Sequence, residues 1–125
     1  FGLTSVTANS DMEDLMEVAD ALEAALPDGL QAWLRALPLQ WRSGNVVCVH
    51  AAMNPTRGPD EQSSRTLLWG HNDHSPRTDD IWVVHGHTIV KEPVAKNGRI
   101  AVDTGAYQSG RLTATEIQSG SCRFF

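Results

Sequence analysis

The sequence has few cysteines, little positive charge and no long apolar segment, and each absence excludes a class of protein. Two cysteines in 125 residues cannot form a disulfide framework, so a reducing compartment, the cytoplasm, is the simplest expectation. The net charge of −5 argues against a general nucleic-acid binder. No apolar run approaches the ~20 residues needed to cross a bilayer, and there is no signal-peptide pattern, so no membrane partner is expected.

What is present is typical of one globular domain, with 41% hydrophobic and 20% charged residues. The charge is uneven. Residues 1–38 carry seven acids and one base, a balance of −6, whereas residues 39–125 carry eight acids and nine bases, a balance of +1. An anionic ligand is therefore expected in the second stretch. The chain opens at Phe1-Gly2-Leu3 without an initiator Met, so we expect it to be a piece of a longer protein.

Two helices are predicted at the start of the chain. Apolar residues recur at helical spacing between residues 11 and 26, with acids on the opposite face and Pro27 at the end. Ser10 and Glu13 have the spacing of a capping box for this helix. A second, short helix is expected from Leu30 to Leu37, before Pro38. The acidic face of the first helix is interpreted as a solvated surface.

Five or six strands are predicted after the helices. A hairpin is expected over residues 39–49, and its second strand, 46–49, is apolar throughout, as in strands buried on both faces. Residues 54–65 have the composition of a loop, with a weak helical turn at 60–69. Further strands are expected at 81–84, on both sides of the Asn97-Gly98 turn, and at 111–117. The fold class predicted is α+β.

The histidines are more informative by position than by number. His50 directly follows strand 46–49, and His85 and His87 directly follow strand 81–84. Side chains at the ends of central strands commonly form sites, and two imidazoles that converge there suit Zn, Mn, Fe or Ni. The alternative is that a histidine at a strand end is a hydrogen-bonded structural residue. His71 and His74 lie in a polar loop where solvent exposure is the simpler interpretation.

Several strings, in this order and at similar spacing, resemble the C-terminal half of bacterial serine/threonine protein phosphatases of the calcineurin-like metallophosphoesterase superfamily. They are Val-Cys-Val-His-Ala-Ala-Met-Asn-Pro at 47–55, Leu-Leu-Trp at 67–69, Val-Val-His-Gly-His-Thr at 83–88, Arg-Ile-Ala-Val-Asp-Thr-Gly-Ala-Tyr at 99–107 and Gly-Arg-Leu-Thr-Ala at 110–114. The resemblance runs from about Leu30 to Ile117, and more loosely includes Phe1-Gly2-Leu3.

The resemblance implies a β-sandwich flanked by helices, with two divalent metal ions (Mn, Fe or Zn) at the edge of a sheet. It implies that His50 and His87 bind the second ion. It further implies that His85, Asp103 and Tyr107 border the site. Two cations roughly 3.5–4 Å apart can hold a bridging hydroxide and neutralise the charge of a phosphoester. Neutral imidazoles add no negative charge, so the ions stay cationic towards phosphate.

The sequence departs from the family in two ways. The motifs Gly-Asp-x-His-Gly, Gly-Asp-x-x-Asp-Arg-Gly and Gly-Asn-His-Glu, which supply the other metal ligands, the phosphate-binding Arg and the proton-donating His, do not occur. His71 stands where the family often has a phosphate-binding Arg two residues after the Trp. We therefore expect residues 1–125 to be the C-terminal part of one metallophosphoesterase domain, inactive by itself.

Three functions follow as hypotheses. The first is a serine/threonine protein phosphatase acting on a phosphorylated protein or a small phosphoester. The second is a dinucleoside tetraphosphate hydrolase of the same superfamily. The third, of another class, is a non-catalytic remnant or interaction domain. Because apolar strands such as 46–49 and 81–84 would lack part of their cover, we also expect an oligomer or a missing N-terminal half.

Overall fold

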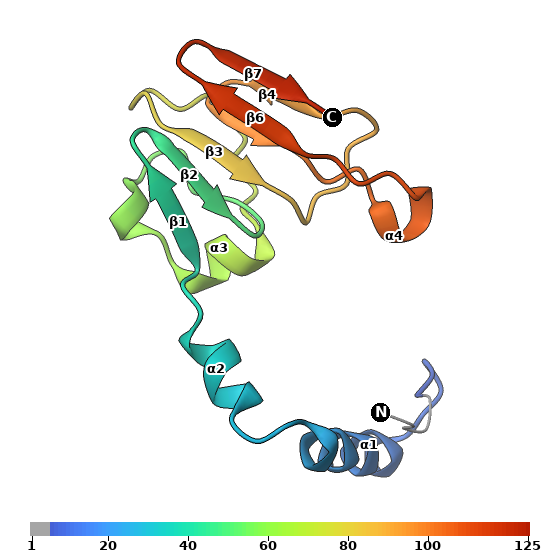
Figure 1. Ribbon diagram of the computed structural model, residues 1–125. Helices are drawn as coiled ribbons and strands as arrows, with labels where there is room; N and C mark the ends of the chain where they lie inside the picture. Colours follow the sequence, from blue (N-terminus) through green and yellow to red (C-terminus); the bar gives the residue numbers. More distant parts are fainter. Residues whose placement is uncertain (1–5) are drawn as a thin grey trace. The chain divides into compact units, whose positions relative to one another are not determined.

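The computed structural model describes residues 6–125, so the Phe1-Gly2-Leu3 part of the resemblance lies outside the described residues. The chain divides into two compact units, Phe1–Leu37 and Pro38–Phe125 (Figure 1). Among the described residues, no helix has both the length and the apolar character needed to span a bilayer.

The first unit contains the two predicted helices, α1 (Met12–Ala25) and α2 (Leu30–Ala36). The predicted capping box is wrong by one residue. Asp11 is the N-cap, and its carboxylate accepts a hydrogen bond from the Asp14 N–H at 2.9 Å. The Ser10 hydroxyl oxygen instead accepts from the Thr7 N–H in the preceding turn, so it is not the group that caps the helix.

The apolar stripe of α1 is not covered within the described residues of this unit. No residue of α1 or α2 is buried, and Met16 on α1 and Trp33 on α2 are 61% and 57% exposed. The helices therefore form from local signals rather than from packing, since the first carries a capped N-terminus and both stop just before a proline.

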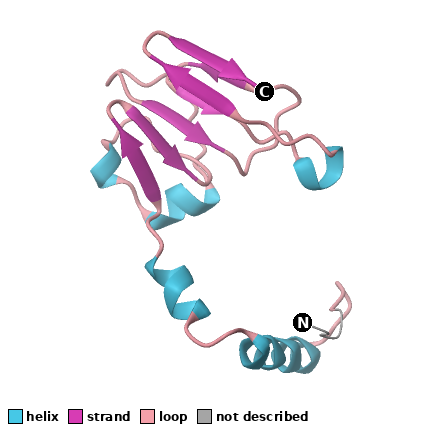
Figure 2. Ribbon diagram, viewed as in Figure 1, coloured by secondary structure: helices cyan, strands magenta, loops and turns pink. Residues whose placement is uncertain are grey.

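The second unit is built on a five-stranded sheet with the order β1-β2-β3-β5-β4. Its strands are β1 (Gln40–Ser43), β2 (Val46–Val49), β3 (Trp82–His85), β4 (Val94–Lys96) and β5 (Arg99–Ala101). The three central strands, β2, β3 and β5, are parallel, and the two hairpin partners β1 and β4 run antiparallel at the edges. With the helices this confirms the α+β class, as the mixture of cyan and magenta elements in Figure 2 shows.

One face of this sheet packs on the main core. Val47 and Val83 from neighbouring strands meet Leu67 of helix α3 (Ser64–Trp69), and Met53 and Ile81 complete the cluster. The helix lies beside β1 and β2 in Figure 1. A 3-10 turn, η1 (Pro59–Glu61), precedes α3, so the weak helical turn predicted at 60–69 is present as two short pieces.

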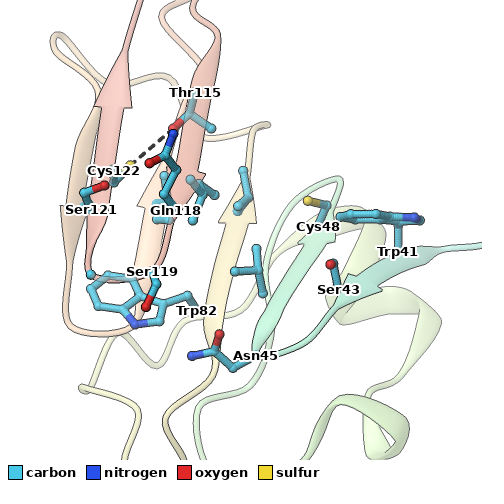
Figure 3. A pocket seen from close by; sticks show the side chains of 16 residues that line it. Trp41, Ser43, Asn45, Cys48, Trp82, Thr115, Gln118, Ser119, Ser121 and Cys122 are labelled. Atoms are coloured by element: carbon cyan, nitrogen blue, oxygen red, sulfur yellow. Dashed lines mark hydrogen bonds between the residues drawn. The ribbon is translucent and has the colours of Figure 1, made fainter.

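The other face of the sheet is turned towards a second, two-stranded sheet made by β6 (Thr115–Gln118) and β7 (Ser121–Phe124). Between them lies a hollow of about 760 Å³, lined on the sheet side by Trp41, Cys48 and Trp82, among others (Figure 3). The expectation that strand 46–49 is buried on both faces is wrong, because Cys48 is only half-buried, and Trp82 on the neighbouring strand is half-buried as well. Partial burial raises the pKa of the Cys48 thiol.

Two elements were not predicted. Strand β7 alternates polar and apolar residues over only four positions, and it is held by pairing with β6. Helix α4 (Ala106–Ser109) is a single turn set between two left-handed glycines, Gly105 and Gly110. The strand predicted at 111–117 begins only at Thr115.

Candidate functional site

The parallel strands bring three loop segments to one edge of the sheet. Val49 of β2 is level with His85 of β3, and His85 is level with Ala101 of β5. The residues that follow these positions, His50, His87 and Asp103, therefore leave the sheet at the same edge, because the carboxyl ends of neighbouring parallel strands coincide.

Backbone hydrogen bonds continue past the ends of the strands and fix these segments to each other. The Gly86 N–H donates to the His50 carbonyl at 2.9 Å, and the Val102 N–H donates to the His85 carbonyl at 3.1 Å. The peptide that carries His87 is thus tied to the one that carries His50, so the two imidazoles are positioned relative to each other by the backbone.

The rings of His50 and His87 lie side by side. Their centroids are 5.1 Å apart with an interplanar angle of 64°, and both residues are exposed. An ion bound about 2.1 Å from one nitrogen of each ring, at a tetrahedral angle, would have the ring centres about 5 Å apart. The spacing therefore suits two ligands of one ion.

The backbone at the site is strained at His87 rather than at Gly86. His87 has φ +62°, in the left-handed region that residues other than glycine seldom adopt. Gly86 has no positive φ, but a methyl group built on it would lie 3.6 Å from both the His50 carbonyl oxygen and Asp103 Oδ2. These are ordinary contact distances, so the geometry at residue 86 does not require glycine, and His87 is the residue that takes the unusual conformation at the site.

His85 has a different environment from its two neighbours. It is half-buried, and its Nδ1 lies 3.2 Å from the Gly86 carbonyl oxygen. Burial, reinforced by the positive charges of Arg99 and His74, lowers the pKa of His85, while the bond to the Gly86 carbonyl opposes the shift. A neutral imidazole at this position supports the loop without adding charge to it.

Asp103 and Tyr107, which the resemblance places at the border of the site, differ in their surroundings. Asp103 is half-buried, its Oδ1 accepts from the Gly105 N–H at 2.9 Å, and its Oδ2 faces Gly86. Tyr107, on α4, is 83% exposed and makes no side-chain hydrogen bond within residues 6–125. The structure thus brings Asp103 to the sheet edge and gives Tyr107 no contact that marks a role.

The loop after α3 is ordered by its own hydrogen bonds. His71 is half-buried, and its Nδ1 accepts from the Asp73 N–H at 3.0 Å, which leaves Nε2 as the protonated nitrogen of the neutral ring. Arg99 donates to the carbonyls of His74, at 2.9 Å, and Asp73, at 3.3 Å. His74 itself is exposed, as expected, whereas the expectation of exposure is wrong for His71.

Two residues at this edge were not recognised from the sequence as site residues. The ring of Trp69 meets that of His87 edge to face, with centroids 6.3 Å apart and an interplanar angle of 87°. Arg99 ties the loop of His71 to β5. The Leu-Leu-Trp string pointed to Trp69 only through the resemblance, and nothing in the local sequence singles out Arg99.

The residues present fit part of a metal centre. Two imidazoles at ligand spacing are suitable donors for Zn, Mn or Fe. Within the described part of the chain, however, no group of three or more His, Cys, Asp or Glu side chains gathers closely enough to enclose an ion. His50 and His87 could therefore serve as two ligands of an ion, which is fewer than a complete metal centre needs.

The chain is similar to proteins named bis(5'-nucleosyl)-tetraphosphatase PrpE [asymmetrical]. It is 46% identical to one from Bacillus thuringiensis (strain Al Hakam) over 69 residues, which cover 44% of this chain and 28% of the relative. It is 32% identical to one from Geobacillus sp. (strain WCH70) over 116 residues, covering 72% of this chain and 47% of the relative. A third, from Bacillus cereus (strain ATCC 10987 / NRS 248), is 35% identical over 83 residues, covering 54% of this chain and 34% of the relative.

The chain thus spans less than half the length of these relatives. No protein-family model matches it. The names of these relatives are those of a dinucleoside tetraphosphatase, and none of the three is named as a serine/threonine phosphatase.

Proposed function

We propose that this chain is part of a metal-dependent hydrolase that cleaves dinucleoside tetraphosphates. The observation that carries the proposal is the pair of imidazoles, His50 and His87, held 5.1 Å apart at the ends of two parallel strands. The names of the relatives favour a phosphoanhydride substrate over the phosphorylated protein that the sequence resemblance put first.

The roles proposed for the residues follow from their geometry. His50 and His87 hold one divalent ion as neutral ligands. When bound, the metal ions of the complete site supply a hydroxide nucleophile and neutralise charge on the phosphoryl oxygens. His71, whose ring is oriented through Nδ1, presents Nε2–H as a donor for a phosphate oxygen.

His85 and Asp103 are proposed to act on the loop rather than on the substrate. His85 stays neutral and lies against the Gly86 carbonyl, and Asp103 fixes the turn at Gly105. Both interactions hold the segment that presents His87.

The metal-binding part of the proposal is tested on the 125-residue chain by calorimetric titration with Mn²⁺ and Zn²⁺. The double variant His50→Ala/His87→Ala is expected to weaken binding by more than about tenfold, because it removes both ligands. His74→Ala, a change to an exposed histidine in the neighbouring loop, is the matched control and is expected to bind as the parent does. Equal binding by the parent and the double variant would refute the site.

The substrate part is tested on the longer protein that carries this chain. Hydrolysis of diadenosine tetraphosphate and of a phosphoserine peptide is compared at equal Mn²⁺ concentration. The proposal expects faster turnover of diadenosine tetraphosphate. The reverse preference would favour a serine/threonine phosphatase. Inactivity towards both substrates, with or without added metal, would favour the non-catalytic remnant.

A further inference from the structure

Helix α3 is fixed to the strand end that carries His50. Its N-terminus is capped by the Ser63 hydroxyl, which accepts from the Thr66 N–H at 3.2 Å. Leu67 is buried in the core, and its carbonyl accepts a hydrogen bond of 2.8 Å from the N–H of Ala51, the residue directly after His50. The last residue of the helix, Trp69, is therefore held in a defined position beside the candidate site.

Trp69 does not use its indole for packing. It is 72% exposed, although its helix neighbour Leu67 is 5% exposed. The aromatic contact that the structure gives Trp69 is the perpendicular one with His87. An edge-to-face contact uses the edge of one ring and one face of the other, so it leaves at least one face of the indole open to a flat ligand, in line with the 72% exposure of Trp69.

We propose that Trp69 is an aromatic subsite that stacks on a nucleobase of the substrate while a phosphate of the same molecule lies at His50 and His87. This inference rests on the proposed function, and it names Trp69 as the residue that recognises the nucleoside part of the substrate. A base offers a π-face to any exposed indole, and stacking of this kind does not depend on which base is bound. The 6.3 Å between the rings of Trp69 and His87 keeps the two contacts within reach of one nucleotide.

The test compares two ligands of the 125-residue chain in the presence of Mn²⁺, diadenosine tetraphosphate and inorganic tripolyphosphate, by calorimetry. Trp69→Ala is expected to weaken binding of diadenosine tetraphosphate about tenfold and to leave tripolyphosphate unchanged. Trp69→Phe keeps a flat ring and is expected to retain most of the affinity. Trp41→Ala is the matched control, since Trp41 is 61% exposed but lines the hollow on the sheet face.

The outcomes separate the two proposals. If tripolyphosphate binding depends on His50 and His87 but Trp69→Ala changes neither ligand, the aromatic subsite is refuted and the phosphate site stands. Equal weakening of both ligands by Trp69→Ala also refutes the subsite, because it shows damage to the site as a whole. Binding of diadenosine tetraphosphate that needs Trp69 but not the two histidines supports the subsite and refutes the metal role. Absence of binding of either ligand to the parent chain refutes the aromatic subsite, whereas the proposed hydrolase function is judged separately by turnover in the longer protein.

Discussion

At the scale of single residues, Arg77 illustrates how a charged group is buried. Its side chain is 1% exposed, and its guanidinium donates to the carbonyls of Asn54 and Arg57, both at 3.0 Å, and to both carboxylate oxygens of Asp79. A buried guanidinium is tolerated when its donors are satisfied in this way. Arg77 therefore joins the loop before η1 to the segment that leads into β3.

The ion pair between Arg77 and Asp79 is expected to make the free energy of unfolding decrease in acid. The hydrogen bond from Arg77 lowers the pKa of Asp79 below its ordinary value of 3.8, despite partial burial. A carboxyl whose pKa is lowered on folding stabilises the protein above the unfolded pKa and loses that contribution as the pH falls through the folded pKa. The free energy of unfolding is thus expected to decrease as the pH is lowered beyond about 4, and this decrease is expected to be smaller in Asp79→Asn than in the parent.

Urea unfolding at a series of pH values between 2 and 7 measures this dependence, with pH steps of about half a unit to resolve the slope. Asp60→Asn, at a carboxylate that forms no ion pair in residues 6–125, is the control and should keep the parent slope. An identical slope in Asp79→Asn and the parent would show that the ion pair does not contribute.

At the scale of elements, the turn between β4 and β5 is the one most constrained by its surroundings. Asn97 and Gly98 both have positive φ, +55° and +76°, as a two-residue hairpin turn of this sequence requires. A methyl group on Gly98 would lie 2.9 Å from Arg77 Cβ and 3.0 Å from the Ile81 carbonyl oxygen. Neither atom is the end of a flexible side chain, so the contact cannot be relieved cheaply.

Gly98→Ala is therefore expected to destabilise the protein far more than Gly120→Ala. Gly120 lies in the β6–β7 turn with nearly the same φ, +75°, and has nothing within 4 Å of an added methyl group. We expect about 1–2 kcal/mol for the conformational strain common to both variants and about 1–3 kcal/mol more at Gly98 for the overlap. Chemical denaturation of the two variants checks the difference, and equal losses would refute the role of the close contact.

The elements that were predicted correctly are those with strong local signals. Helix α1 has helical apolar spacing, the Asn97-Gly98 pair specifies its own turn, and the apolar runs of β2 and β3 mark the central strands. In strand β7 and helix α4 the signal is too short to recognise, since the first alternates polar and apolar residues over only four positions and the second is a four-residue turn between glycines. Local sequence also placed the α1 cap at Ser10, because it does not show that the Ser10 hydroxyl is used by the preceding turn.

The same distinction applies to the candidate site. The positions of His50, His85 and His87 after apolar runs predicted that imidazoles meet at one edge of the sheet, and the resemblance singled out His50 and His87, whose rings the structure brings together. Their role as metal ligands stays a prediction. The contact of Trp69 with His87 and the bonds from Arg99 to the His71 loop join segments far apart in the chain, so no local pattern encodes them.

At the scale of the whole molecule, the chain exposes many large apolar side chains. Within the unit Pro38–Phe125 these include residues more than half exposed on several elements: Trp41, Trp69, Tyr107, Leu112 and Phe125. The hollow between the two sheets adds further apolar surface. Exposed apolar surface of this kind is typical of proteins that associate.

We therefore expect the isolated 125-residue chain to form dimers or larger species in solution. Light scattering coupled to size-exclusion chromatography measures the mass directly, and dilution should shift it towards the monomer. A monomer that persists at concentrations of about 100 μM would contradict the expectation, since hydrophobic association at this scale typically has micromolar affinity.

The parallel pairing of β2 with β3 has a consequence for how the protein reaches its native state. Val47 pairs with Val83 across a long segment of sequence that contains several loops and α3, and β5 pairs with β3. Pairings so distant along the chain are late and slow events, because the entropy of closing a long loop is lost before any contact compensates for it. Refolding is consequently expected to be slower than that of a helical protein of this length, and the two neighbouring imidazoles come together only once β2 and β3 have paired.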